Sequence, residues 1–332
     1  MQTSWTTAHR SVLLEEVLQF LEPRPGGVYI DVTLGAGGHT EALLERFDDN
    51  ICVIGIDRDA SALQLAGERL ARFGARFRPI HGAFGDVLSL LAQHHIAPVD
   101  GILADLGVSS MQLDRPERGF SFQSLGPIDM RMNPDAGETA LDLIGRLPEE
   151  TLADIINEYG EERYARRIAR SLKAAHAAGE LVNTHTLAQV IDAACPSRDP
   201  HKHPATRTFQ ALRIAVNDEL RQVHNLLSDA PRCLKPGGKL VVISFHSLED
   251  RLVKQHMQHA PAVVKAQRLR DGSETAPFAL LTRKPVLPSD EEMRLNPRAR
   301  SARLRAAVRV DPAATAQAQS EPTSSEVAAW PQ

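Results

Sequence analysis

Hydrophobic residues in the first hundred positions form short continuous runs, separated by segments in which apolar residues recur every three or four positions. The runs predict buried strands, and the segments between them predict amphipathic helices. Because near-continuous apolar strands that alternate with helices are typical of parallel sheets, we predict an α/β fold with a doubly wound, Rossmann-like sheet. The predicted strands are 28–34, 51–56, 76–80 and 99–106, and the predicted helices are 12–21, 40–47, 60–72 and 86–94.

The pattern changes after Leu106, where roughly a hundred residues contain no convincing strand. A buried strand returns at 239–245, after a Pro-Gly-Gly turn. We therefore predict an all-helical insertion at 111–217 within a discontinuous α/β domain formed by residues 1–110 and 218–310. The tail at 311–332 has few large apolar residues and is expected to be disordered. Further predicted elements are helices at 139–146, 149–159, 161–177, 186–194, 205–234 and 247–259, and a strand at 278–282.

The composition is that of an ordinary globular protein. Of the 332 residues, 42% are hydrophobic and 24% charged, which excludes collagen-like and disulfide-scaffold classes. The three cysteines are far apart and form no C-x-x-C pair, so a reducing compartment is expected. No secretory signal occurs, and no apolar run approaches the ~18 residues of a membrane span. We therefore expect a cytoplasmic protein that does not enter a membrane.

A glycine-rich turn, DVTLGAGGHT, follows the first predicted strand and is suited to a ligand that lies against bare backbone. A dinucleotide fingerprint requires a third glycine for close helix packing, and Thr40 occupies that position. An acidic residue, Asp31, four positions before the G-x-G is instead the pattern of S-adenosylmethionine (SAM) methyltransferases. A tight structural turn without a ligand is the alternative.

Acidic residues also end the second and fourth predicted strands, at the sheet edge where open α/β folds bind ligands. Asp57 can accept both ribose hydroxyls of an adenosine group, although capping the next helix is the alternative. Asp105 ends the fourth strand. Phe84 follows the third strand, where it can pack on an adenine or belong to the core. The turn LKPGG at 234–238 occurs often in SAM methyltransferases and favours SAM over NAD.

Long motifs then make a family resemblance specific. The strings DVTLGAGGHT, HGAFGD, DGILADLGVSSMQLD, YGEERYARRIAR, HPATRTFQALRIAVNDEL and ISFHSLEDRLVK together resemble the ribosomal RNA small-subunit methyltransferase H family. The resemblance implies a class I SAM-dependent methyltransferase whose helical insertion recognises the substrate, and which methylates N4 of a cytidine in the decoding region of 16S rRNA. The implied SAM contacts are Gly37, Gly38, His39, Asp57, Phe84, Asp105 and Gln112.

The reaction implied by the resemblance needs groups that orient an amine. The lone pair of cytosine N4 is conjugated with the ring, so acceptors for its hydrogens should aim that lone pair at the methyl group. We expect Asp105, with Ser109 or Ser110, to accept these hydrogen bonds. The alternative is that Asp105 only binds SAM and that the serines only form the turn.

The net charge of −4 conceals a segregated distribution, because residues 161–217 carry +4 and 294–309 carry +6, which leaves −14 on the remainder. Basic residues at helical spacing are suited to phosphates, although a solvated helix face is the alternative. Phe120 and Phe122 can stack on an exposed cytosine or pack in a core. The expected RNA contacts are Arg163, Arg166, Arg167, Arg170, Lys173, Arg207, Arg298, Arg300 and Arg303.

Other functions are weighed against this one. A SAM enzyme with a non-RNA substrate would have little use for two basic clusters, and a non-catalytic RNA-binding assembly factor would be expected to have lost Asp57 or Asp105. The histidine pairs at 94–95 and 201–203 lack recognisable partner ligands, so no metal is expected. The expected partner is 16S rRNA within the 30S subunit, and homodimerisation is left open.

Overall fold

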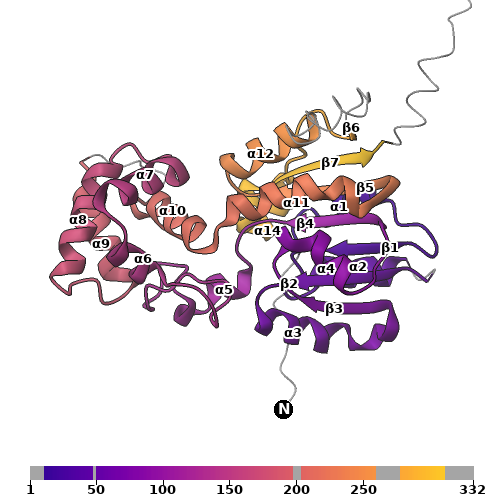
Figure 1. The fold of residues 1–332 in the computed structure, drawn as a ribbon, viewed down its shortest axis with the longest axis horizontal. Helices are drawn as coiled ribbons and strands as arrows, with labels where there is room; N and C mark the ends of the chain where they lie inside the picture. The colour runs from indigo at the N-terminus through magenta and orange to yellow at the C-terminus, as the bar shows by residue number, and fades with distance from the viewer. Residues whose placement is uncertain (1–10, 48–49, 197–202, 259–276, 311–332) are drawn as a thin grey trace, which may run out of the picture.

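The computed structural model describes residues 11–47, 50–196, 203–258 and 277–310 and contains a seven-stranded sheet in the order β3-β2-β1-β4-β5-β7-β6 (Figure 1). Strand β7 runs antiparallel to both neighbours, and the other pairs are parallel. The predicted α/β fold is therefore confirmed. The strands are β1 (Val28–Asp31), β2 (Cys52–Asp57), β3 (Phe77–His81), β4 (Val99–Asp105), β5 (Leu234–Ser244), β6 (Phe278–Leu280) and β7 (Arg303–Arg309).

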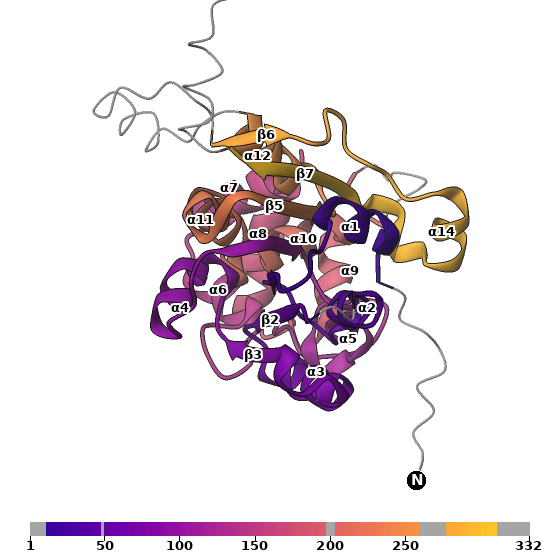
Figure 2. The ribbon, with the colours of Figure 1, turned by 90° about the vertical axis from the view of Figure 1, so that its right-hand side faces the viewer.

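Helices cover both faces of the sheet because side chains alternate along each strand. In β5, Leu240 and Val242 pack with α4, α11 and α12, whereas Val241 and Ile243 pack with α1, α2 and α3. Figure 2 shows α4 and α11 on one side of the sheet and α1 and α2 on the other. Each large apolar side chain buried here contributes about 1.5–3 kcal/mol. These helices are α1 (Leu14–Leu21), α2 (Gly38–Arg46), α3 (Ala60–Leu70), α4 (Val87–Gln93), α11 (Glu219–Cys233) and α12 (Ser247–Gln258).

A second group of helices packs around its own hydrophobic core, beside the sheet (Figure 1). We call this group, with the loop that leads into it, the helical unit, residues 115–217; its described residues contain no strand. In α8, Ala165, Ile168 and Leu172 lie on the buried face, as a helical period requires. The helices are α6 (Ala140–Arg146), α7 (Glu149–Gly160), α8 (Ala165–Ala177), α9 (Thr184–Ala194) and α10 (Ala205–Asn217).

The remaining elements are short. Helix α5 (Ser110–Asp114) connects β4 to the helical unit, and α14 (Asp290–Leu295) precedes β7. Among the described residues, no helix is long and apolar enough to cross a membrane. The 3₁₀ turns are η1 (Ala71–Arg76), η2 (Phe84–Asp86), η3 (Pro116–Arg118) and η4 (Pro297–Ser301).

Some predicted boundaries were wrong. The helix predicted over 205–234 is two helices, because Asp218 adopts a left-handed conformation (φ 52°, ψ 38°) between α10 and α11. Similarly, Glu161 (φ 50°) ends α7, and α8 begins only at Ala165. Strand β7 lies within the basic segment 294–309, for which the sequence predicted RNA contacts and no strand. The tail at 311–332 lies outside the described residues.

Candidate active site

A cavity of about 390 Å³ lies at the carboxyl edge of the sheet, where β1, β2 and β4 end. It brings together all of the residues that the sequence singled out for cofactor binding and catalysis, except Gly37. Its wall includes Gly35, Ala36, Gly38, His39, Asp57, Phe84, Asp105, Ser109, Ser110, Gln112, Arg213, Phe245 and Arg298.

The glycine turn forms one wall of this cavity. Gly37 has a left-handed φ of 77° and is buried beneath the turn, where a Cβ atom would lie 3.0 Å from Leu70 Cδ1. Gly37 therefore allows the turn to pack closely against α3. Gly35 and Gly38, and not Gly37, line the cavity. Thr40, which broke the dinucleotide fingerprint, is buried and donates a hydrogen bond to Asp31 Oδ2 at 2.9 Å.

Asp57 fastens the glycine turn to the end of β2. Its Oδ2 accepts a hydrogen bond from Gly35 N at 2.8 Å, and its Oδ1 accepts one from Asp59 N at 2.9 Å. Burial raises its pKa above the usual range. The helix-capping alternative for Asp57 was wrong, because Asp59 caps α3 by accepting from Ser61 N. Each Asp57 oxygen has a second lone pair, so the carboxylate can still accept ribose hydroxyls.

Asp105 is the least satisfied polar group of the site. Its Oδ1 is buried and has no hydrogen-bond partner among the described residues, and its Oδ2 lies 3.8 Å from Nδ1 of His39. His39 Nε2 donates to the carbonyl of Val12, which leaves Nδ1 facing Asp105. Burial raises the pKa of the Asp105 carboxyl to about 6. Such a carboxylate can accept a hydrogen bond or a proton from a ligand in the cavity.

Ser109 and Gln112 bind each other in a capping box at the start of α5. Ser109 Oγ accepts from Gln112 N, Gln112 Oε1 accepts from Ser109 N, and Gln112 Nε2 donates to Asp59. Ser109 therefore forms the turn at the start of α5, and Gln112 connects α5 to the start of α3. Ser110 also lines the cavity. Phe84 also lines the cavity while it packs against the core, and its contact with an adenine stays a prediction.

The basic residues of α8 divide into two groups. Arg166, Arg167 and Arg170 are exposed on the face opposite its buried side chains, and Arg163, which is also exposed, precedes the helix. Arg170 contacts Glu149, and Arg163 stacks on Tyr164. Lys173 instead donates to the carbonyls of Ile144 and Gly145 at the end of α6, which is a structural contact.

Two other candidates in the helical unit also have packing partners. Arg207 donates to the carbonyl of Glu161 at 2.9 Å. Phe120 is buried in the core of the helical unit, so the core-packing alternative holds for it. Phe122 is half-buried, with its ring centroid 4.7 Å from that of His203.

The C-terminal arginines have different surroundings, because Arg298 and Arg300 lie in η4 whereas Arg303 and Arg305 lie in β7. Arg305 is buried and pairs with Asp250, and Arg303 pairs with the same carboxylate. Arg298 pairs with Asp114 of α5 at the cavity rim, whereas Arg300 is exposed. Strand β7 carries small alanines on both faces, so its sequence lacks the alternation of large apolar and polar residues that would have predicted a strand. The different surroundings of its arginines could therefore not be predicted.

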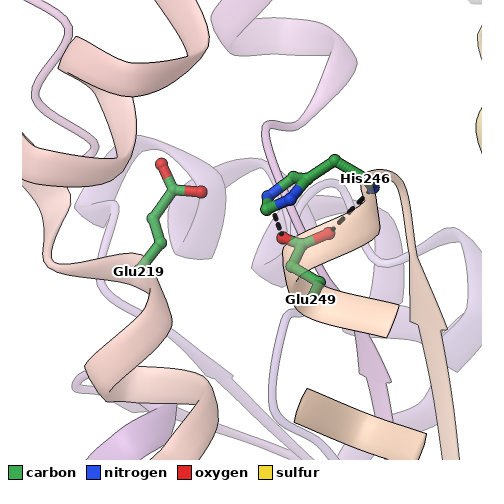
Figure 3. Close-up of side chains that lie close together, drawn as sticks. All are labelled: Glu219, His246 and Glu249. Carbon is green, nitrogen blue, oxygen red and sulfur yellow. Dashed lines mark hydrogen bonds and ion pairs between the residues drawn. The ribbon is translucent and has the colours of Figure 1, made fainter. Parts of the chain in front are cut away.

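Beside the cavity, Glu219 of α11 faces His246 and Glu249 at the start of α12 (Figure 3). His246 Nε2 lies 3.2 Å from Glu249 Oε1, and Glu249 Oε2 accepts a hydrogen bond from Phe245 N. One ligand atom from each residue lies within 4.8 Å of the others, a spacing that could hold a metal. However, both oxygens of Glu219 already accept hydrogen bonds from Arg213, which neutralises its charge.

Sequence patterns did not place Arg213 at the cavity or Glu219 beside it. The two residues lie six positions apart in the sequence, on two different helices. On a single regular helix, only side chains three or four positions apart would be neighbours. The left-handed residue Asp218 between the helices brings them together, and no glycine or proline indicates that break.

Comparison with known proteins identifies the family. The model of the MraW methylase family matches residues 6–310. The chain belongs to the MraW methylase family.

Members of the MraW methylase family resemble the chain closely along its length. Ribosomal RNA small subunit methyltransferase H from Sorangium cellulosum is 54% identical over 303 residues, which cover 91% of each chain. The protein of the same name from Geobacter sulfurreducens is 50% identical over 91% of this chain and 99% of its own. Among solved structures, TrmN from Thermus thermophilus aligns with 90% of this chain and 48% of its own at 12% identity and a TM-score of 0.41, a similarity too weak to bear on fold or function.

The cavity fits the cofactor expected for an MraW methylase. Gly35 and Gly38 expose backbone to it, Asp57 offers acceptors for a ribose, and the unpaired Oδ1 of Asp105 lies at the end of β4. The cofactor is SAM, and the chain is a SAM-dependent methyltransferase. Phe84 and His39 line the same cavity, whereas Gly37 supports the turn from below.

Proposed function

We propose that this protein transfers a methyl group from SAM to the N4 amine of a cytidine in the decoding region of 16S rRNA. The observation that carries the proposal is the Asp105 carboxyl side chain, which is 25% exposed and lines the cofactor cavity at the end of β4. An acceptor at this position can hold an amine hydrogen and orient the nitrogen lone pair. The relatives named ribosomal RNA small subunit methyltransferase H support an rRNA substrate.

The cofactor supplies a methyl group on a sulfonium, which is already activated for displacement. The N4 lone pair forms the new nitrogen–carbon bond as the carbon–sulfur bond breaks, and sulfur retains that electron pair. One amine proton must then leave, and the Asp105 carboxylate accepts it. Its pKa of about 6 keeps most of the group ionised near neutral pH. Orientation alone can contribute on the order of 7–11 kcal/mol to such a reaction.

The helical unit is the proposed RNA-binding part. Its exposed arginines on α8 can contact phosphates, and the methyltransferase domain at 1–110 and 218–310 holds the cofactor. Arg298 at the cavity rim and the exposed Arg300 provide further positive charge for this contact. Because the proposed substrate is rRNA within the 30S subunit, the protein acts in the cytoplasm. The remaining basic candidates, Lys173, Arg207 and Arg303, form hydrogen bonds or ion pairs within the protein. We propose that they contribute to RNA binding only through their positive charge.

The test is nucleoside mapping after reaction with labelled SAM. The substrates are 30S particles and naked 16S rRNA from a strain without its own member of this family. We expect N4-methylcytidine at one position of the decoding region in the particle. The matched variants are Asp105→Asn, which should lose turnover while it binds SAM, and Asp86→Asn, an exposed aspartate that should change neither. Label in a protein or small molecule instead, or no transfer at all, would contradict the proposal.

A further inference from the structure

Phe245 follows β5 and lines the cofactor cavity beside the end of β4. Strands β4 and β5 are parallel neighbours in which Asp105 pairs with Ile243, and Leu106 N donates to the carbonyl of Ile243 at 2.9 Å. The two strands therefore end side by side. A Cβ atom at Gly107 would lie 3.5 Å from Cδ2 of Phe245, so the ring lies against the backbone two positions after Asp105.

Two contacts hold Phe245 in place. Its backbone N–H donates to Glu249 Oε2 at 2.9 Å, and the side chain of that glutamate is only 1% exposed. Hydrogen bonds to a carboxylate are stronger than those between neutral groups. The Phe245 side chain packs against the core on the α1 and α2 side of the sheet, and the residue remains half-buried. Phe245 is thus fixed by its backbone and its packing while it borders the cavity.

The cavity has an aromatic side chain on each side of its cofactor wall. The described residues that line it include Phe84, which follows β3, and Phe245, which follows β5. In the sheet order β3-β2-β1-β4-β5 these positions lie on opposite sides of β1. Phe84 lies on the side of β2, where Asp57 offers acceptors for a ribose. Phe245 lies on the side of β4, where Asp105 is the proposed acceptor for the amine.

We infer that Phe245 is the aromatic surface on which the target cytosine stacks while its N4 amine contacts Asp105. This inference rests on the proposed function. A base must leave its own stack to enter a cavity, and stacking on an aromatic side chain replaces part of what is lost. Phe120 and Phe122, which the sequence suggested for this contact, do not line the cavity. Phe245 is therefore a substrate-positioning residue.

A purely structural role would also explain Phe245, because the residue packs against the core. The two roles differ in their response to the shape of the side chain. Leucine and methionine fill much of the space of phenylalanine but have no ring, whereas tyrosine keeps the ring. If Phe245 stacks on the base, the loss follows the ring and appears in the reaction with RNA. If Phe245 only packs, the loss appears in stability and in SAM affinity.

The experiment uses 30S particles from a strain without its own member of this family. We measure kcat/KM for the particle, SAM affinity by calorimetry and the free energy of unfolding for the wild-type protein, Phe245→Leu, Phe245→Met and Phe245→Tyr. Phe20→Leu is the matched control, because Phe20 of α1 is a half-buried phenylalanine that packs against the same core and does not line the cavity. It should retain the wild-type kcat/KM.

We expect Phe245→Leu and Phe245→Met to lose roughly tenfold to a hundredfold in kcat/KM, because stacking of a base on an aromatic ring contributes a factor of this order. Their SAM affinity should stay within about twofold of the wild-type value, and Phe245→Tyr should keep most of the activity. If one ring-free variant does not fold, the other still decides.

Wild-type kcat/KM in a ring-free variant would overturn the inference while the proposed function stands. A loss confined to SAM affinity, or an equal loss in Phe245→Tyr, would also overturn it. If the wild-type protein forms no N4-methylcytidine on these particles, both the inference and the proposed function are wrong.

Discussion

Arg118 and Asp59 form an ion pair with 2.7 Å between Nη1 and Oδ2, and their side chains are only 10% and 2% exposed. Arg118 also donates to the carbonyls of Arg131 and Met132. Asp59 caps α3, a helix that follows strand β2 of the sheet, whereas Arg118 belongs to the loop that enters the helical unit. The pair therefore connects the two parts through the interior.

Removal of Arg118 should destabilise the protein, because it leaves the buried Asp59 carboxylate without its cation. We expect Arg118→Ala to lower the free energy of unfolding by about 3–5 kcal/mol. The surface pair Arg146–Glu138, in which Arg146 is 60% exposed, provides the matched control. Arg146→Ala should cost under about 1 kcal/mol. Urea denaturation measures both values, and equal losses would show that the burial of the Arg118 pair has no special importance.

Asp105→Asn should separate stability from activity. The folded-state pKa of about 6 lies above the usual value of 3.8 because burial disfavours the charge. The folded state therefore holds its proton more tightly than the unfolded state, and the cost of the charged carboxyl appears as the pH rises through about 4 to 6. An asparagine does not incur this cost.

The stability of Asp105→Asn relative to wild type should thus be higher at pH 8 than at pH 4 by about 2–3 kcal/mol. Urea denaturation of both proteins at the two pH values measures these free energies of unfolding. If the variant and the wild type differed by the same amount at pH 4 and pH 8, the prediction would be wrong. Turnover of the wild-type protein should fall below about pH 6, as Asp105 becomes protonated. The neighbouring Asp31, whose pKa burial also raises to about 6, contributes to the same titration.

Asp57→Asn should weaken cofactor binding. Both carboxylate oxygens accept backbone hydrogen bonds, from Gly35 and Asp59, and an amide has only one oxygen to offer. One backbone N–H then loses its partner, and the glycine turn loosens. We expect the Kd for SAM to rise by roughly tenfold to a hundredfold. Calorimetric titration with SAM measures the change. An unaltered Kd would show that Asp57 neither binds the ribose nor holds the turn.

Charge reversal on the exposed face of α8 should weaken RNA binding without affecting the cofactor. Arg166→Glu and Arg167→Glu should each lower affinity for 16S rRNA and reduce the slope of log K against log salt by about 0.7–0.9. Affinity for SAM should stay unchanged, because neither residue lines the cavity. Arg232→Glu, which reverses an exposed charge on α11, is the control. An unchanged salt slope would show that this helix face is only solvated.

The sequence predicted most of the sheet and the cofactor wall because those features depend on local patterns. Apolar runs predicted strands β1 to β5. Asp57 and Asp105 lie at the ends of β2 and β4, as expected. Strand β7 was missed because its arginines interrupt any apolar run and its alanines carry no clear alternation. The Arg213–Glu219 pair depends on the left-handed backbone of Asp218, which the residue types around it do not indicate.

The three residues 57–59 have a consequence for how this enzyme can be altered. Asp57 lines the cofactor cavity, Arg58 donates to the carbonyl of Asn217 at the end of α10, and Asp59 binds Arg118. One turn of backbone thus serves the cofactor and holds both ends of the helical unit. The helical unit therefore cannot be transferred alone to another methyltransferase. Residues 57–59 would have to be transferred with it, and these residues include part of the wall of the cofactor cavity.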